Sequence, residues 1–110
     1  MRVVLDTNVI VSAAITPHGK PAKAVEIVMS GENVKLCYSE GMLDEYRKVL
    51  PRPKLKITSE KQRAYIEVTK NVGLLFNPAK SDVPFNDESD RIFYDTAKEA
   101  GAIRAYHALF

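Results

Sequence analysis

A short apolar run near the start of the chain, residues 3–5, ends at a single acid, Asp6, and a second apolar run follows almost at once. We interpret residues 2–6 as a buried β-strand and residues 8–15 as a short helix. Open α/β sheets present their chemistry at such junctions, where a parallel strand ends and a helix begins. The junction therefore predicts an α/β fold with a carboxylate at the edge of the sheet where ligands bind.

Strand-like and helix-like segments alternate along the rest of the chain. Further strands are predicted over residues 34–38 and 73–76, and a fourth begins at Ala102 and Ile103. Predicted helices begin near Pro21, at Ser39, at Ser59 with Gln62 in capping-box spacing, and near Glu88. Strands separated by helices imply right-handed crossovers and a parallel sheet covered on both faces. We therefore expect a three-layer α/β/α architecture.

Length and composition limit the class of protein. With 110 residues, 45% of them hydrophobic and 27% charged, the chain is predicted to fold as one domain over residues 1–110. No apolar stretch approaches the roughly 20 residues of a membrane helix, and no signal-peptide pattern precedes the first strand. The single cysteine, Cys37, allows no internal disulfide and is expected in the core. We expect a cytoplasmic protein with no membrane partner.

Basic residues gather in the middle of the sequence although the net charge is only +2. Between Arg47 and Arg63 the only acid is Glu60. Such a stretch is suited to a phosphate backbone, and a solvated connection between helices explains it equally well. The candidate RNA-binding residues are Arg47, Lys48, Arg52, Lys54 and Lys56.

Asp6 is the first candidate for chemistry. A helix cap is its simplest structural role, because aspartate is favoured at that position. Thr7 and Asn8, which follow, carry a hydroxyl and an amide able to orient a carboxylate or a bound water. Two short polar residues are more than a cap requires, so we favour a functional role for Asp6 with Thr7 and Asn8 in support.

Two further acids lie at the edges of predicted helix faces. On the helix after Ser39, Glu45 lies about a quarter-turn from the centre of the apolar stripe, whereas Asp44 points to solvent. A surface glutamate is the alternative. Asp90 opens the last helix beside Asp87, and taken alone this pair is better explained as a helix cap. Asp95 is expected in solvent.

Three carboxylates at one edge of a sheet repel each other unless a cation lies between them. A divalent metal removes this penalty. Because no His or Cys accompanies the acids, Mg²⁺ or Mn²⁺ is favoured over zinc. His18 and His107 are not spaced as ligands, and we expect both on the surface.

Three segments carry a resemblance to a known family: VLDTNVIVSA with Asp6, YSEGMLDEY with Glu45, and DESDRIFYDTA with Asp90. Together they resemble the PIN-domain nucleases, and in particular the members described as toxins of toxin–antitoxin pairs, which include the VapC group. The resemblance implies an RNase-H-like fold with strand order 3-2-1-4-5 and a metal-dependent endoribonuclease activity. It also implies an RNA substrate and an antitoxin partner. It makes Asp6, Glu45 and Asp90 the catalytic metal ligands, with Thr7 and Asn8 in support. Asp87, beside Asp90, is a further candidate for a supporting role.

The C-terminal segment AGAIRAYHALF departs from this family. Members usually carry an apolar strand followed by Thr-Gly-Asp or Thr-Gly-Asn, with a fourth metal-site residue. Here no acid follows Glu99, and Arg104, Tyr106 and His107 fit poorly in a buried central strand. We expect an incomplete C-terminal end without the last strand, weakened metal binding, and homodimerisation through an exposed sheet edge.

Two alternative functions stay open. A degenerate PIN fold that binds RNA or a protein without cutting explains the lack of a fourth acid. A haloacid-dehalogenase-like phosphatase also has an acid after its first strand, but that family has a second Asp two residues later, where this chain has Asn8. If the nuclease hypothesis holds, Asp6→Asn abolishes cleavage with folding nearly intact, and Asp44→Asn is silent.

Overall fold

The structure is a computed structural model that describes residues 1–105. Strands and helices alternate in the order β1, α1, α2, β2, α3, α4, β3, α5, β4, with a short 3-10 helix between α3 and α4. Their bounds are β1 Arg2–Leu5, α1 Thr7–Ile15, α2 Lys20–Ser30, β2 Lys35–Tyr38, α3 Glu40–Val49, the 3-10 helix Pro53–Leu55, α4 Ser59–Val72, β3 Leu74–Leu75, α5 Ser89–Ala100 and β4 Ile103–Ala105.

The four strands form one parallel sheet in the order β3-β2-β1-β4. Val3 of β1 pairs with Leu36 of β2 on one side and with Ile103 of β4 on the other. The chain thus runs from β1 to β2 and β3 on one side of β1 and returns to β4 on the other side of β1. This makes the carboxyl end of β1 a topological switch point. This order confirms the arrangement expected of the first four strands.

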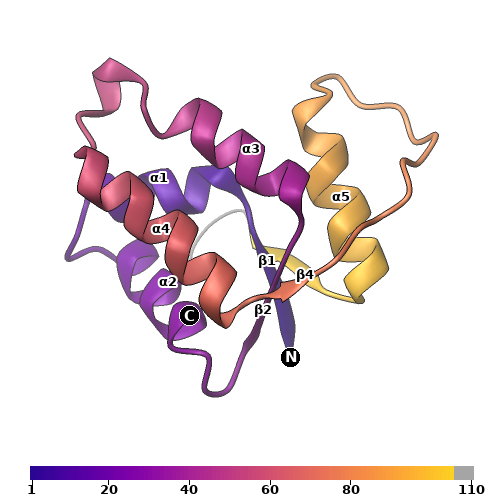
Figure 1. Cartoon of the computed structure of the whole chain (residues 1–110), viewed down its shortest axis with the longest axis horizontal. Coiled ribbons are helices and arrows are strands. Elements are labelled where there is room, and N and C mark those ends of the chain that lie inside the picture. Colours follow the sequence, from indigo (N-terminus) through magenta and orange to yellow (C-terminus); the bar gives the residue numbers. More distant parts are fainter. Residues whose placement is uncertain (106–110) are drawn as a thin grey trace.

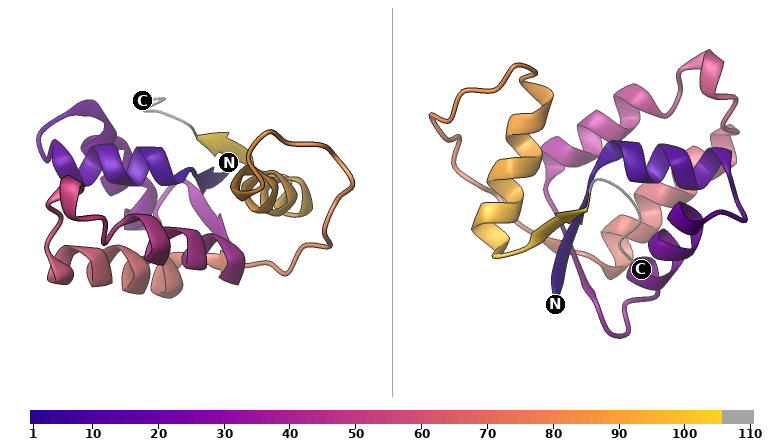
Figure 2. Two further views of the ribbon diagram at one scale, coloured as in Figure 1. Left: turned by 90° about the horizontal axis from the view of Figure 1, so that it is seen from above. Right: turned by 180° about the vertical axis from the view of Figure 1, so that it is seen from behind.

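Helices cover both faces of the sheet. Figure 2 (left) shows α5 on one side of the strands and α1 to α4 on the other, and Figure 1 labels each element. Apolar side chains from the strands and both helical layers form the core, among them Ile10, Leu36, Met42 and Phe93. The predicted α/β class is confirmed. Tyr106 and His107, and with them the expectation that the last strand is missing, lie outside the described residues.

The predicted cap of α3 is confirmed, and the cap of α4 lies one residue earlier than predicted. Ser39 caps α3 by accepting a hydrogen bond from the Met42 N–H, as predicted. The cap of α4 is Thr58 and not Ser59, because Thr58 has extended backbone angles and its Oγ1 accepts from the Lys61 N–H at 3.2 Å. The Gln62 side chain donates to the Ile57 carbonyl oxygen instead of closing a capping box with Ser59.

Asp95 corrects a second expectation, since it is buried and does not lie in solvent. Its Oδ2 accepts a hydrogen bond from the Ser81 backbone N–H at 3.1 Å. The polar segment between β3 and α5 therefore covers a side of α5 that faces away from the sheet. A helix covered on two sides has a wider buried face than one apolar stripe indicates.

Two further details concern the solvent exposure of individual residues. The buried residues of α4 are Ile66 and Thr69, whereas Tyr65 and Val72 pack against the core partly buried and Ala64 is exposed. His18 is exposed, as expected. Within residues 1–105 no helix is both long and apolar enough to span a membrane.

Candidate active site

Asp6 lies at the carboxyl end of β1 and serves as the N-cap of α1. Its Oδ2 accepts a hydrogen bond from the Asn8 N–H at 3.0 Å, and its own N–H donates to the carbonyl oxygen of Ala105 on the neighbouring strand. The cap uses only one carboxylate oxygen. The structural and the functional interpretations of Asp6 are therefore compatible, since Oδ1 remains for another partner.

That partner is Arg104 on β4. Its Nη2 lies 2.5 Å from Asp6 Oδ1 and 2.8 Å from Asp90 Oδ1, and its Nε lies 3.1 Å from the same Asp6 oxygen. The guanidinium carbon is 5.0 Å from the centroid of the Phe93 ring, close enough for a cation–π contact. The expectation that Arg104 fits poorly in this strand is wrong. Arg104 is accommodated in β4 because its guanidinium extends away from the strand and neutralises two carboxylates.

Asp90 occupies the first turn of α5, where its carboxylate also favours the helix dipole. Its backbone N–H donates to the Asp87 carbonyl oxygen at 3.0 Å. Asp87 Oδ1 in turn accepts from the Ser89 N–H at 3.0 Å, and hydrogen bonds from Ser89 lower the pKa of Asp87. Asp87 thus supports the start of α5, although Glu88 holds the N-cap position and its side chain makes no cap bond.

A cavity of about 250 Å³ brings the predicted acids together. Asp6 and Asp90 line it, and Glu45 enters from α3, whereas Asp44 is exposed and pairs with Arg47. The full lining is Asp6, Thr7, Asn8, Glu45, Lys48, Val49, Arg52, Asp87, Ser89, Asp90 and Phe93. Acids from three distant parts of the sequence therefore face one polar space.

Close packing sets α3 and α5 next to this cavity. A Cβ added to Gly41 would lie 2.6 Å from Ile92 Cγ1, so only glycine lets α3 approach α5 here. Ser39 Oγ and Thr96 Oγ1 lie 2.8 Å apart in the same region and are hydrogen-bonded. These contacts fix the helices that carry Glu45 and Asp90.

Tyr46 links α3 to the strand that carries Asp6. Its hydroxyl donates to the Leu5 carbonyl oxygen at 2.5 Å, and its ring is buried against Phe93. Burial, and then the negative charge of Asp6, raise the pKa of Tyr46 far above its usual value. Tyr46 therefore stays protonated and acts as a structural link, not as an acid or base.

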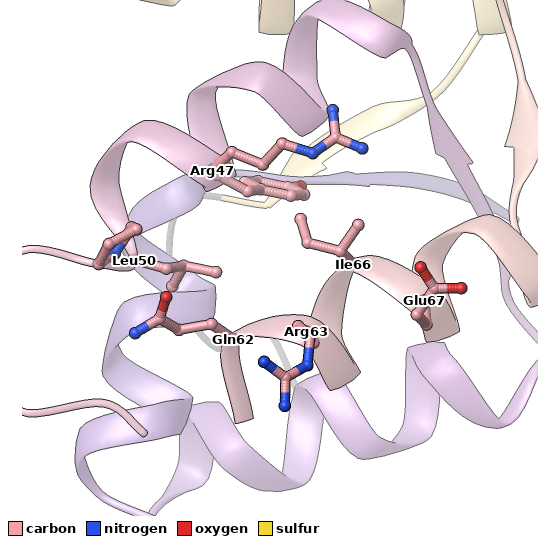
Figure 3. A pocket seen from close by; sticks show the side chains of 8 residues that line it. Arg47, Leu50, Gln62, Arg63, Ile66 and Glu67 are labelled. Carbon is pink, nitrogen blue, oxygen red and sulfur yellow. The ribbon is translucent and has the colours of Figure 1, made fainter. Parts of the chain in front are cut away.

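The predicted basic residues divide into three groups. Lys48 and Arg52 line the acidic cavity. Arg47 instead lines a separate pocket of about 260 Å³ between α3 and α4, where it reaches over Ile66, as Figure 3 shows. Lys54 and Lys56 are exposed and line neither space. Lys48 and Arg52 are the basic residues placed to act together with the acids.

The comparisons with known proteins identify the family. A family model described as PIN domain matches residues 2–103, so this chain belongs to the PIN-domain family. The chain is also similar to the uncharacterized protein MJ1680 of Methanocaldococcus jannaschii, with 29% identity over 106 residues, which are 94% of this chain and 68% of that protein. PIN domains are nuclease-type domains that bind RNA and generally depend on a divalent metal ion.

The residues at the cavity meet the family's metal requirement in chemistry but not in arrangement. The donor chemistry is suitable, since carboxylate oxygens are the ligands that Mg²⁺ and Mn²⁺ prefer. The spatial arrangement of these donors is not suitable for a metal ion. Among residues 1–105, no three His, Cys, Asp or Glu side chains are close enough together to hold a metal ion, and Arg104 bridges two of the three acids. The site as it stands does not fit a divalent metal.

Proposed function

We propose that this chain is an endoribonuclease that hydrolyses RNA phosphodiesters at the Asp6 cavity. One observation carries the proposal: acids from β1, α3 and α5 and basic residues from the end of α3 and the loop after it line one cavity. A nuclease needs both kinds of group. Basic side chains bind the phosphate backbone of the RNA, and the acids act at the phosphate that is cleaved. Membership of the PIN family supports the same activity.

Each group in the cavity has a task under this proposal. Lys48 and Arg52 bind phosphates on either side of the scissile bond, with little selection among bases. Asp6, Glu45 and Asp90 would form the metal-binding set once Arg104 no longer holds two of them, supported by Thr7, Asn8 and Asp87. The cofactor would be Mg²⁺ or Mn²⁺, which supplies Lewis acidity and an activated water when bound. We assign no individual step to it, because Arg104 holds two of the acids.

The toxin role extends the proposal further. It includes an antitoxin protein as partner, a cytoplasmic location and a homodimer. Its support is the sequence resemblance to toxin members of the family. In the described part of the chain β4 has β1 as its neighbour on one side, and Ile103 on it is half exposed, which is compatible with pairing between copies.

A second candidate function is favoured by the ion pair of Arg104. A PIN fold whose acids are neutralised from within would bind RNA through Lys48 and Arg52 without cutting it. An assay of RNA cleavage distinguishes this binding module from the endoribonuclease. The phosphatase alternative has less support, because Asn8 replaces the second acid it needs and the chain belongs to the PIN family.

The proposal predicts that Asp6→Asn removes RNA cleavage. A labelled single-stranded RNA is incubated with the parent and the variant in Mg²⁺, Mn²⁺ or EDTA, and products are resolved on a gel. We expect a drop of at least about 10- to 100-fold, because removing even a group that only positions a metal ligand typically costs that much. Asparagine still caps α1 but loses its charge opposite Arg104, so circular dichroism must show that the variant is folded.

Asp44→Asn is the matched control, because Asp44 lies on the same helix as Glu45 and its side chain is 76% exposed outside the cavity. Its cleavage rate should equal that of the parent. Equal rates for Asp6→Asn and the parent would contradict the proposal. RNA binding without metal-dependent products in any variant would favour the binding module instead.

Binding itself tests the role of the basic residues. Lys48→Gln should weaken RNA binding and reduce the slope of log K against log salt by about 0.7, the value for one phosphate contact on a single strand. Fluorescence anisotropy at several salt concentrations measures both quantities. Lys70→Gln, at an exposed position on α4, is the control. An unchanged slope for Lys48→Gln would place the RNA elsewhere.

A further inference from the structure

Two acids of the cavity already share a cation that the chain itself supplies. One nitrogen of Arg104, Nη2, bridges Asp6 Oδ1 and Asp90 Oδ1 at 2.5 and 2.8 Å. Nε adds a second bond to the same oxygen of Asp6. Asp6 Oδ2 accepts a hydrogen bond from the Asn8 N–H, and Oδ1 accepts from Arg104. Arg104 therefore occupies the space between the two carboxylates.

Burial makes this contact costly to break. The side chains of Arg104 and Asp6 are only 9% and 8% exposed, whereas that of Asp90 is 47% exposed. A guanidinium does not lose its proton in a protein, so its charge is permanent. A buried carboxylate that loses its partner is left uncompensated, which is strongly unfavourable. Asp6 is thus released at low cost only when another cation takes the place of Arg104.

Other basic residues at the cavity do not compete for this position. Lys48 and Arg52 also line it, and both are exposed. Within residues 1–105 neither forms an ion pair with Asp6 or Asp90, and both of those acids pair with Arg104. The two exposed basic side chains therefore stay available for phosphates while Arg104 neutralises the acids.

We propose that Arg104 is the resident counter-ion of this site and that a divalent cation binds Asp6 and Asp90 only by displacing it. The inference rests on the proposed function, which makes these acids the metal-binding set. It adds a restraint, namely that a metal ion does not bind Asp6 and Asp90 while both are paired with Arg104. The apparent dissociation constant for the metal equals the intrinsic one divided by the fraction of molecules in the open state, and minor states are typically populated at 0.1–10%. The restraint therefore weakens metal binding by roughly tenfold or more.

Manganese binding tests the inference without any reference to activity. Free Mn²⁺ is measured by electron paramagnetic resonance in titrations of the parent chain, of Arg104→Gln and of the double variant Arg104→Gln with Asp6→Asn. We expect Arg104→Gln to bind Mn²⁺ at least about tenfold more tightly than the parent. The double variant should lose that gain, because Asp6 supplies the released oxygen. Arg63→Gln removes the same charge at an exposed position on α4 and should bind as the parent does.

The outcomes separate this inference from the proposed function. Equal and tight Mn²⁺ binding by the parent and Arg104→Gln overturns the restraint but leaves the nuclease proposal standing. No binding by either chain overturns the restraint and removes the metal from the proposed function as well. A similar gain for Arg63→Gln also overturns it, because general charge would then explain the effect.

A measurement on the unmodified chain covers the case in which Arg104→Gln does not fold. The Nε–H signal of Arg104 is followed by nuclear magnetic resonance while Mg²⁺ is added. Displacement predicts that this signal shifts together with the carboxyl carbon of Asp6 and with one common midpoint. A shift of the Asp6 carbon while the Arg104 signal stays unchanged, or no shift of either, would overturn the inference.

Discussion

At the residue scale, one hydrogen bond fixes how close α3 lies to the end of β1. The hydroxyl of Tyr46 donates to the Leu5 carbonyl oxygen, one residue before Asp6. Both groups are buried, so the bond has no water to replace it. Tyr46 thereby sets the position of its neighbour Glu45 relative to Asp6.

Tyr46→Phe should therefore destabilise the fold while keeping its shape. The variant leaves the Leu5 carbonyl oxygen without this partner, and an unsatisfied buried acceptor costs about 1–3 kcal/mol. Urea unfolding followed by circular dichroism should show a lower midpoint with an unchanged m-value. A midpoint equal to that of the parent would show that the bond contributes nothing to stability.

The same residue predicts how stability depends on alkaline pH. Burial, and secondly Asp6, raise the pKa of Tyr46 in the folded state, while an unfolded tyrosine titrates near 10. This contribution is fully present below about pH 10 and is lost as pH rises above it, because only the unfolded chain then ionises. The stability of the parent should fall above pH 10 more steeply than that of Tyr46→Phe. Parallel curves would contradict this assignment.

At the element scale, the starts and the buried faces of the helices show which features can be predicted from the sequence pattern. The starts of α1 and α3 could be predicted, because Asp6 and Ser39 each stand directly after a buried strand. The start of α4 was displaced by one residue, since Thr58 and Ser59 are both good caps and only the backbone angles decide between them. Asp95 was assigned to solvent because one apolar stripe reveals nothing of a loop packed on the opposite side.

The cap of α4 gives a paired test. Thr58→Ala removes the bond from the Lys61 N–H and should cost about 1 kcal/mol, as N-cap substitutions typically do. Ser59→Ala, one residue further, should change stability by no more than about 0.5 kcal/mol. Chemical denaturation of both variants measures the difference. The reverse order of effects would place the cap at Ser59.

At the scale of the whole molecule, the parallel topology explains why three distant acids share one cavity. Parallel strands end at the same edge, and the reversal of strand order at β1 opens a space there. The sequence therefore predicted the gathering of Asp6, Glu45 and Asp90 before any coordinates, although their metal-binding role stays a prediction. It did not predict Arg104, because an arginine in a short apolar strand looks like a misfit until its neighbours in space are known.

Arg104 also explains how a chain of this family keeps its acids together in a stable fold. Like charges at one sheet edge raise the free energy of the folded state, and a cation is needed to offset this. The guanidinium supplies it from β4, the strand next to Asp6. The whole account therefore depends on the space between Asp6 and Asp90 being a position for a cation.

Anomalous scattering from manganese tests that claim most directly. Crystals of Arg104→Gln and of the parent are soaked in Mn²⁺, and anomalous difference maps are compared at the cavity. We predict a peak in the variant within roughly 2.5 Å of carboxylate oxygens of both Asp6 and Asp90, and a much weaker one in the parent. A variant map without a peak there, or with manganese bound only at other side chains, would contradict the account.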